Sequence, residues 1–186
     1  MNARTILFLT AIFIFLGILV VVALRYYLRA RHASAGSWEQ LLERLTVLDR
    51  DGVAKIALDY ADESGRRKTE SLSTELESSQ IFGLIGGLAG LEALEKNCAV
   101  LIDMAFFVQQ WYPEALVLAE ELRLSAREIE WHVERLRGAA KTGNLEPSFA
   151  SYAQPAIAKY YLMTQRVLAL YERGNLPMLI DLQRAI

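Results

Sequence analysis

Residues 81–124 read IFGLIGGLAGLEALEKNCAVLIDMAFFVQQWYPEALVLAEELRL, and this long apolar stretch decides the fold class. Its apolar residues recur at helical spacing, which predicts helices that pack against one another. A single unbroken helix of this length is unusual in a small domain, so we expect breaks near Asn97 and Pro113. No convincing strand pattern occurs elsewhere in the chain. The sequence therefore predicts an all-helical fold.

Four glycines stand close together at the start of this stretch: Gly83, Gly86, Gly87 and Gly90. In one continuous helix they would share a face about 100° wide. Each costs about 1 kcal/mol in a helix interior, so we expect another helix to approach their backbone closely. That helix can belong to the same domain, to a second copy or to a partner protein. A phosphate-binding loop is a poor match, because no strand precedes the glycines and no Lys-Ser or Lys-Thr follows them.

Two chemically distinctive residues lie further along the stretch. Asp103 interrupts an apolar run, and Lys96 and Gln110 share its helical stripe, so we interpret it as part of a narrow solvated stripe. The alternative is a functional buried carboxylate. Cys98 is the only cysteine, which excludes an intrachain disulfide, and we expect it to be a small buried hydrophobe.

Beyond the stretch, Ser125 and Glu128 form a capping box that predicts the start of a helix running to Arg137. Glu128 lies one turn before His132 on this helix. The pair is a candidate for acid–base chemistry or metal binding, and an ordinary surface contact is the alternative.

The last third of the chain carries clear helix signals. We expect a loop over residues 141–154, then a helix opened by Pro155, where a proline suits the first turn. Gly174 and Pro177 predict the end of that helix, followed by a short terminal one.

On the other side of the apolar stretch, Ser37 and Gln40 form a capping box that predicts a helix reaching Leu48. The dipeptide Asp51-Gly52 predicts its end. A short second helix is expected over residues 53–60.

Near the N terminus, residues 5–24 read TILFLTAIFIFLGILVVVAL, about twenty uncharged residues. A helix of this length spans the roughly 30 Å hydrocarbon core of a bilayer. We expect a single-pass transmembrane helix here, with the bilayer as its partner. The residues that follow are assigned to the membrane interface: Arg25, Tyr26, Tyr27, Arg29 and Arg31.

Basic residues flank this segment unequally, with Arg4 before it and three arginines soon after it. The positive-inside rule then predicts a plasma (bacterial inner) membrane protein whose C-terminal domain is cytoplasmic. The alternative is a cleaved signal peptide, since Ala33-Ser34-Ala35 has the small residues that signal peptidase accepts. Cleavage there would export the domain.

Composition narrows the function. The 186 residues are 53% hydrophobic and 23% charged, which indicates a folded chain. The whole chain has a formal net charge of −2, and residues 1–32 hold four arginines and no acid. The net charge of the remaining residues is therefore −2 − 4 = −6, which disfavours nucleic-acid binding. One cysteine and two histidines are too few for a structural zinc site. No nucleotide-binding or hydrolase motif occurs, and we expect no cofactor.

The sequence thus predicts an anchor over residues 1–32 and a helical-bundle domain of about five to seven helices over residues 33–186. It favours a non-catalytic accessory or scaffold subunit that binds another protein, or a second copy, at the membrane. We expect the contact surface at the four glycines or around Trp111 and Tyr112. The alternative is a membrane-bound helical enzyme or small-ligand-binding protein, with Glu128, His132 or Asp103 converging in a closed pocket.

Overall fold

The computed structural model describes residues 9–22, 24, 37–62, 65–68, 76–109 and 111–186. The chain divides into two compact units, Met1–Ser37 and Trp38–Ile186, and each is described by itself. The described residues form helices joined by turns and irregular segments, with one isolated antiparallel bridge between Ala61 and Arg67. The all-helical prediction is confirmed.

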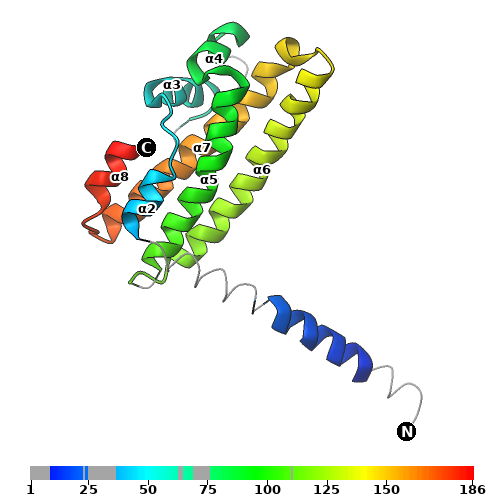
Figure 1. The fold of residues 1–186 in the computed structure, drawn as a ribbon, viewed down its shortest axis with the longest axis vertical. Coiled ribbons are helices and arrows are strands. Elements are labelled where there is room, and N and C mark those ends of the chain that lie inside the picture. Colours follow the sequence, from blue (N-terminus) through cyan, green and yellow to red (C-terminus); the bar gives the residue numbers. More distant parts are fainter. Residues whose placement is uncertain (1–8, 23, 25–36, 63–64, 69–75, 110) are drawn as a thin grey trace. The chain divides into compact units, whose positions relative to one another are not determined.

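The second unit is a helical bundle. The helices of the described residues in it are α2 Trp38–Glu43, α3 Arg50–Tyr60, α4 Ser78–Ile85, α5 Gly87–Val108, α6 Ala115–Lys141, α7 Leu145–Arg173 and α8 Leu179–Ala185. The three longest, α5, α6 and α7, lie side by side (Figure 1). Near the end where α5 begins, α4 packs on α5 and α7; α3 packs on α7. Toward the opposite end, α2 packs on α5, and α8 packs on α7.

The core lies between α5, α6 and α7. Aliphatic side chains from all three helices are fully buried there, among them Leu101, Leu122, Ile129 and Ile157. Burying each such side chain contributes roughly 1.5–3 kcal/mol to stability. Cys98 is buried with them, as predicted, and burial raises the pKa of its thiol to about 12. It is therefore an unreactive core residue.

An aromatic cluster joins α2 to the far end of α5 and α7. The Trp38 ring lies 5.9 Å from that of Phe107 and 5.4 Å from that of Tyr171, measured between centroids. The buried Tyr171 hydroxyl donates a 2.9 Å hydrogen bond to the Met104 carbonyl. These contacts hold the short helix α2 against the bundle.

The apolar stretch breaks at one of the two predicted places. Helix α5 ends at Val108 and α6 begins at Ala115, so the break near Pro113 is confirmed. The break predicted near Asn97 is wrong, because α5 continues through that residue. Asparagine is a weak helix former, but the hydrogen bonds that its side chain makes to other segments override this preference.

An unpredicted break occurs at Gly86, which lies between α4 and α5 with a φ of +79°. A left-handed backbone favours glycine, and here it ends one helix and lets the next begin in a new direction. The four glycines consequently do not share the face of one helix. The spacing of the glycines alone did not distinguish a helix-packing face from a turn between two helices.

Two predicted helix starts are wrong. Ser125 lies in the middle of α6, where its hydroxyl donates a 3.1 Å bond to the Glu121 carbonyl in place of capping. Pro155 lies inside α7, which begins ten residues earlier, and the predicted loop shrinks to residues 142–144. Burial of Phe149 and Ala153 against the bundle outweighs the hydrogen bond lost at the proline.

The start of the second unit also differs from the prediction. Helix α2 ends at Glu43, five residues before the predicted end, and an extended segment leads to α3. Asp51 and Gly52 stand in the first turn of α3 instead of ending a helix. An acidic residue is favourable there because it faces the positive end of the helix dipole. The short terminal helix is confirmed as α8.

In the first unit, residues 9–22 and 24 are helical. Their large apolar side chains are exposed, including Phe13 at 71%, Ile14 at 60% and Phe15 at 63%. None of the helices formed by the described residues has both the length and the apolar content that a membrane crossing requires. The predicted transmembrane helix is thus unsupported by the described residues, and residues 5–8 and 23 of its span lie outside them.

Candidate functional site

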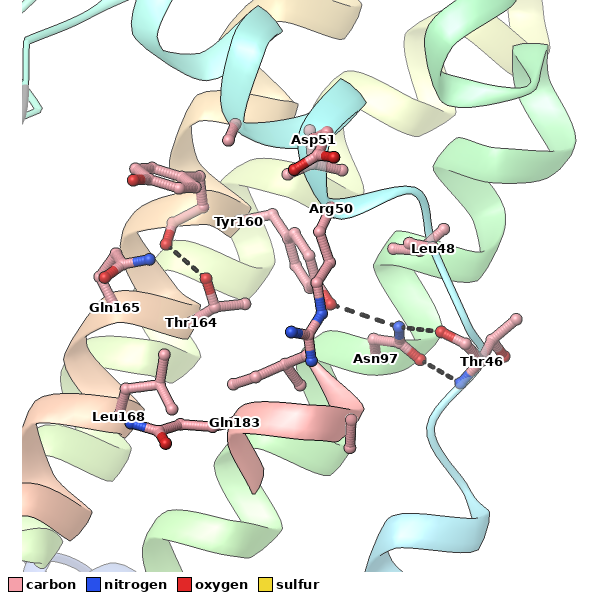
Figure 2. Close-up of a pocket in the computed structure, with 15 residues that line it drawn as sticks. Thr46, Leu48, Arg50, Asp51, Asn97, Tyr160, Thr164, Gln165, Leu168 and Gln183 are labelled. Carbon is pink, nitrogen blue, oxygen red and sulfur yellow. Dashed lines mark hydrogen bonds between the residues drawn. The ribbon is translucent and has the colours of Figure 1, made fainter. Parts of the chain in front are cut away.

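A buried asparagine organises one side of the bundle. Asn97 on α5 is only 2% exposed. Its Oδ1 accepts a 2.8 Å bond from the Thr46 backbone N–H, and its Nδ2 donates to the Thr46 carbonyl at 2.8 Å and to the Tyr160 hydroxyl at 3.3 Å. One side chain therefore ties α5 to α7 and to the extended segment before α3 (Figure 2).

A cavity of about 310 Å³ opens beside this network. It lies at the small end of the roughly 300–1,000 Å³ range of ligand sites. The extended segment before α3, the first turn of α3, and helices α7 and α8 supply most of its walls. The residues that line it are Thr46, Leu48, Arg50, Asp51, Val53, Ala54, Asn97, Tyr160, Tyr161, Thr164, Gln165, Leu168, Gln183, Ala185 and Ile186.

Tyr160 stays protonated in this environment. Burial raises the pKa of its hydroxyl to about 12, while the Asn97 bond and the charge of Arg50 act in the opposite direction. The hydroxyl oxygen accepts the Asn97 bond, so its own proton remains available to donate. The Tyr160 hydroxyl is accordingly a hydrogen-bond donor at the cavity wall.

A second, more open groove of about 500 Å³ runs between α6 and α7. Tyr112 lines it together with Val117, which is 64% exposed. An ion pair between Arg166 and Glu121, with an N–O distance of 3.2 Å, crosses it from α7 to α6. Trp111, beside Tyr112 in the chain, is 57% exposed. Two neighbouring aromatic residues therefore stand at or beside an open, mixed apolar and charged surface.

The predicted glycine surface divides into two parts. Gly83 and Gly86 have open space where a Cβ atom would lie. A Cβ at Gly87 would lie 2.6 Å from the ring of Phe82, and one at Gly90 would collide with the backbone of the last residue of α4. The close approach at these last two positions comes from α4 itself, within the same domain.

The two candidate carboxylates, Asp103 and Glu128, pair with different cations, and neither lines the cavity. Asp103 pairs with Arg44 at 2.9 Å on the outside of α5, with its side chain 30% exposed. Glu128 on α6 pairs with Lys159 on α7 at 2.9 Å. Neither carboxylate lines the cavity of Figure 2. They do not form a shared site.

His132 packs in a small aromatic cluster on the bundle surface. Its ring lies 4.9 Å from that of Trp131 and 6.0 Å from that of Tyr152. Burial lowers the pKa of His132; the charge of Glu128 raises it and that of Lys159 lowers it. Among the described residues, no three His, Cys, Asp or Glu side chains form a group able to hold a metal ion.

The residues assigned to the membrane interface, 25–27, 29 and 31, lie outside the described residues. Sequence reasoning also missed the residues that build the cavity. Asn97 had a usable signal, since helical spacing places this lone amide on the same face as Leu94 and Leu101, yet it was interpreted as a break. No sequence pattern marked Arg50 and Tyr160 as site residues. They are 110 positions apart in the chain, and only the fold brings them together.

Comparison with known proteins gives no relative for this chain. No protein-family model matches it, and no curated protein or solved structure matches it significantly.

Proposed function

We propose that this protein is a membrane-anchored, non-catalytic helical module that binds another protein at the membrane. The observation that carries the proposal is the exposed apolar helix of residues 9–22. Its apolar side chains point in all directions, whereas a helix at a protein surface buries one apolar stripe. It belongs to an uncharged run of about twenty residues, which is the length that a bilayer requires.

The groove between α6 and α7 is the proposed protein-binding surface. Exposed aromatic and aliphatic side chains beside paired charges are typical of protein interfaces. Val117 supplies exposed apolar area in the groove, and Tyr112 supplies an amphipathic contact. Trp111, the exposed chain neighbour of Tyr112, extends the apolar surface beside the groove. The separation of Asp103 from the Glu128–His132 pair argues against the enzymatic alternative.

Position-specific photocrosslinking in native membranes tests the partner. A photoreactive residue at Val117 is expected to give a crosslinked species of defined mass, and the same residue at Ile180, an exposed apolar position on α8, is the matched control. Loss of the species when Trp111 is replaced by Ala supports the groove. Equal crosslinking at both positions, or none at Val117, contradicts it.

Protease protection tests the proposed sidedness. In inverted inner-membrane vesicles, the domain of residues 38–186 is expected to be digested, and in intact spheroplasts it is expected to survive. Mass spectrometry of the mature chain should find residues 1–35 still present. A mature chain that begins after Ala35, or the reverse protection pattern, overturns the cytoplasmic assignment.

A further inference from the structure

Arg50 makes no ion pair with any described residue, although other arginines of the bundle do. It stands at the first position of α3, and Figure 2 shows its side chain extending past the Tyr160 hydroxyl into the cavity. A guanidinium group matches a planar carboxylate through two parallel hydrogen bonds. The cavity wall therefore includes an exposed guanidinium group that makes no ion pair with a described residue.

Tyr160 adds a second donor on the same side of the cavity. Its hydroxyl position is fixed by Asn97, which is itself held by both backbone groups of Thr46. A donor held in place loses little conformational entropy when a ligand binds. Arg50 and Tyr160 together present an anion with two different donors, one charged and one neutral.

The rest of the lining limits the ligand. Apolar side chains of Leu48, Val53 and Leu168 also face the cavity, and they suit a short hydrocarbon tail. Asp51 lines the same space and adds a negative charge. Its repulsion disfavours phosphate and other multiply charged anions more than a single carboxylate. The volume of about 310 Å³ also limits the length of that tail.

We propose that this cavity binds a small organic monocarboxylate with a short apolar tail, of about the size of butyrate. This role goes beyond the anchoring and protein binding proposed above and does not depend on either. Arg50 would hold the carboxylate, Tyr160 would donate to one of its oxygens, and the tail would lie against the apolar wall.

An NMR titration of the full-length protein in detergent micelles tests the proposal. The probes are butyrate, butanol, butylammonium and inorganic phosphate. We expect saturable amide shifts around residues 46–54 and 160–168 with butyrate only. The variant Arg50→Gln should weaken butyrate binding about tenfold or more, because a charge-assisted bond is lost. Tyr160→Phe should weaken it about threefold to tenfold.

Lys55→Gln is the matched control, since it removes a positive charge from the exposed side of α3 without touching the cavity. It should bind butyrate as the original protein does. Thermal unfolding followed by circular dichroism establishes that each variant is folded before it is titrated. The proposal is overturned if butyrate gives no saturable shift, if butanol binds equally well, or if Arg50→Gln and Lys55→Gln bind alike.

Discussion

Two apolar helices of this chain use their hydrophobic residues in opposite ways. Helix α5 buries Leu91, Leu94 and Leu101 completely in the bundle core, and its charged residues lie toward the surface. The helix of residues 9–22 leaves its apolar side chains exposed instead. Apolar sequence alone therefore does not identify a core: what matters is whether other parts of the chain cover it. The exposed helix requires a different environment, which we propose is the bilayer.

The largest expected effect comes from placing a carboxylate in each helix. Leu101→Asp buries a charge in the packed core, and we expect the cooperative unfolding transition to be lost. Ile14→Asp should leave the thermal unfolding of the bundle unchanged, since that side chain is 60% exposed. Circular dichroism melts of the two variants measure the difference. Equal destabilisation would show that the first helix is part of the folded core.

A smaller effect is expected at the one amide buried in α5. Asn97→Ala should destabilise the bundle by about 1–3 kcal/mol, because the Thr46 backbone groups lose their partner. Asn97→Asp keeps the acceptor for the Thr46 N–H but loses the donor, so it should also destabilise. Urea denaturation measures both variants. An Asn97→Ala variant as stable as the original protein would mean that the extended segment is held by other contacts.

The junction where the apolar stretch turns offers a pair of substitutions with opposite signs. Gly83→Ala in α4 should stabilise the fold by up to about 1 kcal/mol, because alanine is the better helix former and the space is open. Gly86→Ala should destabilise it by about 1 kcal/mol, because the φ of +79° strains any L-residue. At both positions an added Cβ meets no other atom within 4 Å, so urea denaturation isolates the backbone effect. If both substitutions changed the stability in the same direction, the result would contradict the turn at Gly86.

The smallest effect is a pH dependence on the surface of α6. Burial holds the pKa of His132 below its ordinary 6.5, so the unfolded chain binds the proton more readily. The stability that His132 contributes is therefore present above pH 6.5 and is lost as the pH falls through the lowered folded value. Denaturation of His132→Gln on both sides of pH 6.5 should show a weaker loss on acidification than the original protein. An identical loss would place the titrating group elsewhere.

The sequence predicted the class of fold better than the places where its helices begin and end. Helical spacing and the absence of strand patterns were sufficient for the all-helical bundle, and Pro113 marked a true break. The helix starts predicted at Ser125 and Pro155 were wrong, because local capping signals count for less than burial of residues such as Phe149. The turn at Gly86 required a left-handed backbone that residue spacing does not specify.

The cavity was not predictable from the sequence. Its polar wall combines Arg50, Asn97 and Tyr160, which stand on three different helices. No short spacing records that arrangement, since it follows from the packing of α3 and α5 on α7. The candidates that did share a short spacing, Glu128 and His132, lie elsewhere on the surface of α6.

The most direct test of the anchoring claim is membrane retention after an alkaline carbonate wash. The full-length protein should remain in the membrane pellet. Phe15→Lys combined with Ile18→Lys should move it to the supernatant, since each lysine costs roughly 2.5–3.5 kcal/mol near the centre of a membrane helix. Val117→Lys combined with Ile180→Lys places two lysines at exposed apolar positions of the bundle and should leave retention unchanged. Retention of the first double variant, or a soluble original protein, would contradict the claim that the exposed helix anchors this chain to a bilayer.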